Sequence, residues 1–126
     1  MVREFIITPN APQPAGPYSQ AIKAGSFVYV AGQGPVDSKT GKMGEDIETQ
    51  TRQTLLNVKA IIEASGCTMS DVVKVSVFLK NASDFSKMND IYKTFFPLNP
   101  PTRTTVEVKF VAPGMLIEID AVAYRD

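Results

Sequence analysis

The sequence predicts an α+β fold in which two helices pack on one face of a mixed β-sheet. Alternating apolar residues predict short strands near both ends of the chain and one in the middle, and two other segments have apolar residues at helical spacing. The resulting order is strands, helix, strand, helix, strands, which is typical of the α+β class. With 126 residues, 44% of them hydrophobic, we expect a single domain over residues 1–126.

The N-terminal part of the chain predicts three strands. Residues 3–7 form the first, and residues 21–24 and 27–31 form a hairpin that turns at Gly25-Ser26. Residues 10–17 are rich in Pro and Gly and predict a rigid, irregular segment. Residues 35–44 are expected to be a loop.

The first helix is predicted to begin near Asp46, a good N-cap, and to end at about Ser65, where Gly66 follows. Its apolar stripe consists of Ile47, Leu55, Val58, Ile61 and Ile62. A strand follows at residues 72–79, in which Val73, Val75, Val77 and Leu79 should share one face and Lys74 and Ser76 the other.

Ser83 or Asp84 is expected to cap the second helix, and Pro97 to stop it. The apolar stripe of this helix is Phe85, Met88, Ile91, Tyr92, Phe95 and Phe96. Two more strands, residues 103–110 and 116–124, are joined by a turn at residues 112–114. In strand 72–79, Val72 and Phe78 share the polar face, so we expect the open face of the sheet to contact another subunit.

The composition excludes several classes of site. The 13 basic residues balance the 13 acidic ones, so no global field attracts nucleic acid or a membrane. Histidine is absent, which excludes Ser-His-Asp and Cys-His sites within the chain and removes the commonest metal ligand. The single Cys67 cannot form an internal disulfide, and residues 1–7 do not resemble a signal peptide. We expect a soluble, cytoplasmic protein without a metal site.

Arg103 and Glu118 are the strongest candidates for chemistry. Arg103 follows Pro100-Pro101-Thr102 and opens a strand, where a guanidinium could bind a carboxylate through two hydrogen bonds. The alternative is a surface or structural ion pair. Glu118 lies in an apolar strand, opposite the face of Ile117 and Ile119, where partial desolvation would raise its pKa and suit it to proton transfer. Its alternative is an ordinary solvated strand face.

Three further residues have open roles. Tyr18 is either a pocket wall or a core aromatic, and Asn89 is either a helix residue of the site or an exposed one. Cys67 has no basic neighbour in sequence, and we interpret it as structural or incidental.

Several motifs together resemble the RidA/YjgF family, also called the endoribonuclease L-PSP family, over nearly the whole chain. The motifs lie at residues 10–12, 16–21, 31–33, 51–53, 57–61, 88–89, 101–103 and 117–121. The resemblance implies a chorismate-mutase-like fold, a homotrimer with clefts between subunits, no cofactor, and deamination of 2-iminobutanoate and 2-iminopropanoate.

The resemblance also implies roles for residues. Arg103 would bind the substrate carboxylate and Glu118 would act on a water. The substrate-binding pocket would include Tyr18, Asn89, the backbone of Gly32, and Thr105. Two positions depart from the bacterial pattern: Ala31 stands where Ser is common, and Thr105 where Cys is common. Thr serves at position 105 if that residue acts through its backbone carbonyl.

The function implied is therefore hydrolysis of reactive 2-imino acids to 2-oxo acids and ammonia. One alternative is a regulatory protein that binds 2-oxo acids without turnover. The other is an endoribonuclease or translation inhibitor, which the balanced charge and missing His disfavour.

Overall fold

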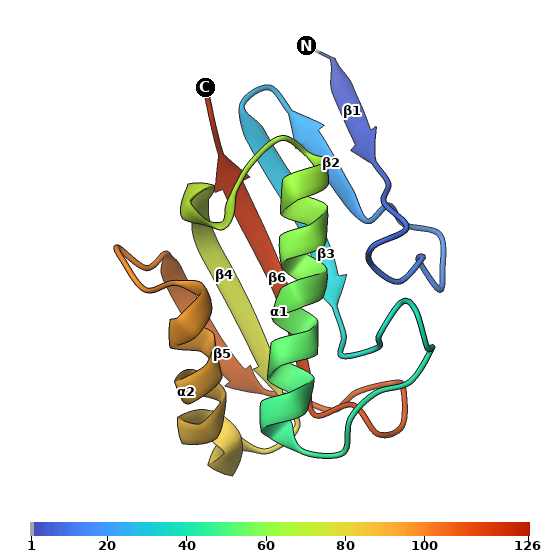
Figure 1. Cartoon of the computed structure of the whole chain (residues 1–126), viewed down its shortest axis with the longest axis vertical. Helices are drawn as coiled ribbons and strands as arrows, with labels where there is room; N and C mark the ends of the chain where they lie inside the picture. The colour runs from blue at the N-terminus through green and yellow to red at the C-terminus, as the bar shows by residue number, and fades with distance from the viewer. Residues whose placement is uncertain (1) are drawn as a thin grey trace.

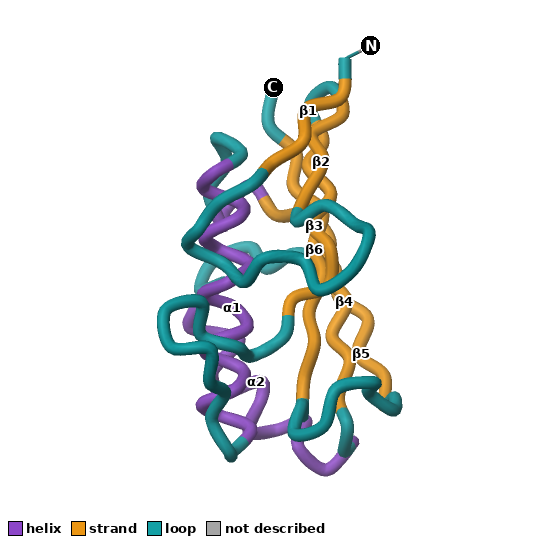
Figure 2. Tube along the Cα trace, turned by 90° about the vertical axis from the view of Figure 1, so that its right-hand side faces the viewer, coloured by secondary structure: helices purple, strands orange, loops and turns teal. Residues whose placement is uncertain are grey.

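A computed structural model describes residues 2–126 and has one six-stranded mixed sheet with two helices on the same face (Figures 1 and 2). The strand order is β1-β2-β3-β6-β4-β5, and within residues 2–126 only β4 and β5 run parallel. The strands are β1 (Arg3–Ile6), β2 (Ala21–Ala24), β3 (Phe27–Gln33), β4 (Val72–Leu79), β5 (Thr102–Glu107) and β6 (Ile117–Tyr124). The helices are α1 (Ile47–Ala64) and α2 (Phe85–Phe95). The predicted α+β class is thereby confirmed.

The core lies between the helices and the sheet. In β6, Ile117, Ile119, Ala121 and Ala123 are buried toward the helices, while Glu118 and Asp120 are half-buried on the opposite face. The predicted stripe of α1 is buried in full. Asp46 caps this helix by accepting a hydrogen bond from the Thr49 amide at 2.7 Å. Gly66 follows it with φ +92°, a conformation that side chains disfavour.

A β-bulge makes the predicted faces of β4 wrong at its start. Val72 pairs with Ala123 and Lys74 with Val122, so β4 has one extra residue at Val73. Val72 is consequently buried, whereas Val73 is 44% exposed. From Val75 onward the alternation is as predicted. A bulge depends on the partner strand, and therefore local alternation could not reveal it.

The region after α2 also differs from the prediction. The strand spans Thr102–Glu107 rather than residues 103–110, and it pairs in parallel with β4. The connection β4-α2-β5 places β5 at the sheet edge, because parallel neighbours need such a crossover. Residues 108–116 must then cross the end of β4 to reach β6 (Figure 1).

Short 3₁₀ turns precede β4 and α2, and the sequence did not predict them. They are η1 (Met69–Asp71) and η2 (Ala82–Asp84). Asp84 occupies the predicted N-cap position of α2, but its side chain makes no capping hydrogen bond in the part of the chain that the structure describes.

The sheet face away from the helices retains exposed apolar side chains. Strand register places Phe5, Tyr29 and Val122 in one row on this open face. Tyr29 is 50% exposed, and Phe27, Val106 and Tyr124 are also exposed. Within residues 2–126, neither helix has the length and apolarity needed to cross a membrane.

Candidate functional site

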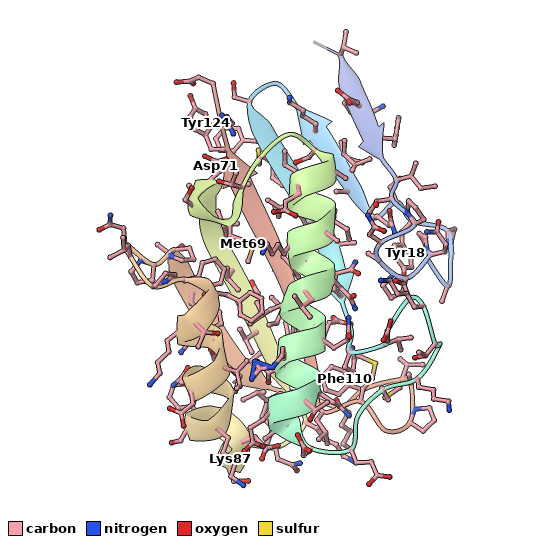
Figure 3. The ribbon with its side chains drawn as sticks, in the orientation of Figure 1. Tyr18, Met69, Asp71, Lys87, Phe110 and Tyr124 are labelled. Carbon is pink, nitrogen blue, oxygen red and sulfur yellow. The ribbon has the colours of Figure 1, made fainter. Side chains whose placement is uncertain are left out.

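A pocket of about 620 Å³ opens at the end of β3 and β6. Three of the predicted site residues line it: Tyr18, Gly32 and Glu118. Much of the remaining wall is apolar and comes from Phe78, Val108, Phe110 and Met115. Figure 3 labels Tyr18 in the N-terminal loop and Phe110 in the segment after β5, which reach the pocket from opposite ends of the chain. The fold therefore assembles one hollow from segments far apart in sequence.

The Glu118 carboxyl packs directly against the backbone of Gly32. A Cβ at position 32 would lie 2.7 Å from Oε2 and 2.8 Å from Cδ of Glu118. Gly32 lies where the register of β3 against β6 shifts, between Val30 and Gln33. The absence of a side chain at this irregularity creates the space that the carboxyl occupies.

Partial burial raises the pKa of the Glu118 carboxyl above its ordinary value, and the neighbouring charge of Asp120 raises it further. The predicted desolvation of this carboxylate is thus supported, and the alternative of an ordinary solvated face is not. A carboxylate of raised pKa accepts a proton more readily than a solvated one, which suits it to general-base catalysis.

Buried Gln20 anchors the Pro-rich segment that precedes Tyr18. Its Oε1 accepts a hydrogen bond from the Thr8 amide at 2.7 Å, and its Nε2 donates to the Pro12 carbonyl at 3.0 Å. The Tyr18 side chain is 52% exposed, so the alternative of a core aromatic is wrong. Its hydroxyl accepts a hydrogen bond from the Ala15 amide at 3.3 Å.

Two buried polar residues of α1 hold the loops on the other side of the pocket. Gln50 Nε2 donates to the carbonyls of Gly44 and Gly114, both at 2.8 Å. Asn57 Nδ2 donates to the carbonyls of Gly34 and Val36 at 3.0 and 2.9 Å. Because these side chains satisfy buried loop carbonyls, they fix the irregular backbone around the pocket.

Arg103 lies on the helix side of β5, beside α2. Its Nη1 donates a hydrogen bond to Asn89 Oδ1 at 2.7 Å. The salt bridges found within residues 2–126 are Lys93–Asp90 and Arg125–Asp71. Neither includes Arg103, so the structure does not support the alternative of an ion pair. A further opening of about 500 Å³ is lined by Asn89, Tyr92 and Arg103.

Arg103 and Glu118 point to opposite faces of the sheet. Arg103 is in register with Val75, which is buried toward the helices. Glu118 is in register with Phe78, on the open face. Because paired residues project to the same side, one protomer cannot place both groups on one small ligand. The predicted residues form two groups: Tyr18, Gly32 and Glu118, and Arg103 with Asn89.

Thr105 belongs to neither pocket. It lies on the helix side of β5, and its buried hydroxyl has no hydrogen-bond partner among residues 2–126. Cys67 is buried, in agreement with a structural role. In the described part of the chain, no three His, Cys, Asp or Glu residues gather in a way that could hold a metal ion.

Sequence reasoning missed two aromatic neighbours of Arg103. Phe85 and Tyr92 were assigned only to the core stripe of α2, yet the Arg103 guanidinium lies over both rings. Their spacing from Asn89, four residues before and three after, placed all three on one helix face. This spacing indicates a shared contact with Arg103 only once β5 is known to lie beside α2.

Comparisons with known proteins agree with the fold. The sequence pattern of the family described as Endoribonuclease L-PSP matches residues 8–125. A RutC family protein of Pyrococcus horikoshii is 52% identical over 126 residues, covering 99% of this chain and 100% of the relative. The 2-iminobutanoate/2-iminopropanoate deaminase of Salmonella typhimurium is 46% identical, covering 95% and 96%. The crystal structure of E. coli TdcF with bound serine superposes with a TM-score of 0.94 at 39% identity, covering 98% and 99%.

Proposed function

Because this chain belongs to the Endoribonuclease L-PSP family, we propose that it hydrolyses reactive 2-imino acids, such as 2-iminobutanoate and 2-iminopropanoate, to 2-oxo acids and ammonia. The observation that carries the proposal is Glu118: a carboxyl of raised pKa, held against bare backbone in a pocket. The deaminase name of the Salmonella relative supports the reaction class. The serine bound to TdcF supports an amino-acid-sized ligand with a carboxylate.

Arg103 binds the substrate carboxylate in this proposal. Its guanidinium has no carboxylate partner in residues 2–126 and keeps donors free beside the Asn89 hydrogen bond. A planar guanidinium can hold a carboxylate by two parallel hydrogen bonds, which fixes the orientation of the imine carbon. Tyr18 and the backbone at Gly32 shape the remainder of the site.

Glu118 acts as the base. In the protonated imine, Glu118 takes a proton from a water molecule while the water oxygen bonds to the imine carbon and the C=N π electrons move to nitrogen, which gives a neutral carbinolamine. Glu118 then returns this proton to the amine nitrogen. The C–N bond breaks as the hydroxyl oxygen forms the C=O bond of the 2-oxo acid, ammonia leaves, and Glu118 takes the hydroxyl proton and passes it to solvent. Positioning and one carboxylate suffice for modest acceleration, since imines also hydrolyse in water.

The two groups of residues meet in a homotrimer. Arg103 and Glu118 face opposite sides of the sheet, and the open face exposes apolar side chains that a second copy would cover. We propose that Arg103 and Asn89 of one subunit face Glu118, Tyr18 and Gly32 of its neighbour. Apolar burial of about 25 cal/mol per Å² would favour the assembly.

An oxidase-coupled assay tests the function. An amino acid oxidase generates the imine, and its lifetime is followed with and without this protein. Calorimetric titration with 2-oxobutanoate measures binding in parallel. Binding without acceleration would replace the enzyme with a 2-oxo acid sensor. RNA cleavage that persists after a high-salt wash would favour the endoribonuclease that the family name describes.

Arg103→Ala tests the carboxylate site. Removing one partner of a buried charge pair costs about 2–5 kcal/mol, so kcat/KM should fall roughly 30- to several thousand-fold. Arg103→Lys should recover part of the loss, because it keeps the charge without the planar fork. Circular dichroism and the oligomer mass should stay unchanged. Parent-like activity in folded Arg103→Ala would refute the assignment.

A further inference from the structure

We infer that Phe85 and Tyr92 are positioning residues that hold the Arg103 guanidinium in the orientation needed to bind a ligand carboxylate. This inference rests on the proposed function, in which Arg103 receives that carboxylate. It gives the rings of Phe85 and Tyr92 a role that the sequence motifs did not assign.

The contacts come from one face of α2. Phe85, Asn89 and Tyr92 are spaced by four and three residues, which stacks them on successive turns. The Arg103 Cζ lies 5.4 Å from the centre of the Phe85 ring and 4.7 Å from that of Tyr92. Asn89 lies between these two residues in the sequence, and its Oδ1 accepts a hydrogen bond from Arg103 Nη1. Both ring distances are within the range of cation–π attraction.

The arrangement suits carboxylate binding because the aromatic rings hold the guanidinium without using its N–H donors. The Arg103 guanidinium lies over the two rings, whereas its N–H donors point outward in the plane of the group. Asn89 uses one of about five donors, so most of the edge stays free for a ligand. A salt bridge would have used that edge.

The rings also reduce the entropy lost on binding. A free arginine side chain samples many rotamers, and ordering it opposes association. Here the side chain is ordered before the ligand arrives, by an amide and two rings. Removing a ring should therefore weaken ligand binding more than it slows the chemical step.

The exposure of Phe85 agrees with this role and not with packing alone. Phe85 was predicted in the apolar stripe, yet its side chain is 43% exposed. Tyr92 is buried, but its hydroxyl has no partner among residues 2–126. The ring, and not the hydroxyl, is what Tyr92 contributes, so Tyr92→Phe serves as the matched control.

The experiment compares Phe85→Leu, Tyr92→Leu and Tyr92→Phe with the parent protein. Nitrogen-15 relaxation of the Arg103 Nε–Hε group, assigned by its loss in Arg103→Lys, reports the order of the guanidinium. We expect the Leu variants to lose order and to raise KM and the 2-oxobutanoate Kd about tenfold, the loss of roughly one cation–π contact, with little change in kcat. Tyr92→Phe should match the parent.

Phe85→Leu keeps the test decisive if Tyr92→Leu fails to fold, because the Phe85 ring is partly exposed. Parent-like order and Kd in Phe85→Leu would overturn the inference. A fall in kcat at constant KM would overturn it as well. If the parent hydrolyses no imine, the proposed function fails, while the order of the Arg103 side chain still decides whether the rings position it.

Discussion

Replacing Gly32 with Ala should displace the Glu118 carboxyl without unfolding the protein. The added Cβ would lie 2.7 Å from Oε2, against the 3.4 Å at which ordinary contact begins, so the carboxyl must withdraw by about 0.7 Å. The atoms that clash are the end of a flexible side chain. The backbone of β3 can therefore keep its place while the carboxyl moves.

We expect Gly32→Ala to lower the turnover rate. A misplacement of about 1 Å can cost on the order of 10²-fold, so we expect kcat to fall by roughly 10- to 100-fold. The free energy of unfolding should change by less than about 1 kcal/mol, since Gly→Ala also stabilises by about 0.4–1 kcal/mol through the unfolded chain.

The measurement pairs the oxidase-coupled imine assay with urea unfolding. Gly16→Ala is the matched control, because its Cβ would meet Tyr18 Cε2 at 3.5 Å, an ordinary contact. Parent kcat in a folded Gly32→Ala protein would refute the link between the carboxyl position and turnover. A loss of several kcal/mol would show that the backbone, not the carboxyl, takes up the strain.

Four other predictions concern Glu118 and the open face of the sheet. Glu118→Gln should keep the oligomer mass and 2-oxobutanoate affinity but lower kcat by about 10²–10⁴-fold; a parent-like kcat would assign the activation of water to another group. Turnover should decline as pH falls through the raised pKa of Glu118, because a protonated carboxyl cannot accept a proton. Asp120→Asn should lower the pH of that midpoint but remove only part of the shift, since burial is the larger cause. An unchanged midpoint would show that the Asp120 charge does not raise the pKa of Glu118. The native carboxyl also holds its proton more tightly than the unfolded one, so the free energy of unfolding should fall as pH rises through the raised pKa, and Glu118→Gln should flatten this dependence. Val106→Asp on the open face should give monomers in sedimentation equilibrium, whereas Leu56→Asp on α1, equally 43% exposed, should not; an intact Val106→Asp trimer would place the interface elsewhere.

The sequence by itself determined the helices, most strands and the face on which Glu118 lies. These features depend on local periodicity and caps: the stripe of α1, the Asp46 cap, and the alternation through Ile117, Glu118 and Ile119. Each is encoded within a few residues, because side-chain direction repeats every 3.6 residues in a helix and every two in a strand.

Tertiary structure alone decided how the site residues are grouped. The bulge at Val73 and the edge position of β5 arise from pairing with strands distant in sequence, so no local sequence pattern predicts them. The same holds for Gly32, whose bare backbone matters only because β6 brings Glu118 against it. Arg103 meets Phe85 and Tyr92 for an equivalent reason: the crossover through α2 returns β5 beneath that helix. Sequence patterns identified Arg103 and Glu118 as candidate site residues, but only the pairing of the strands places them on opposite faces of the sheet.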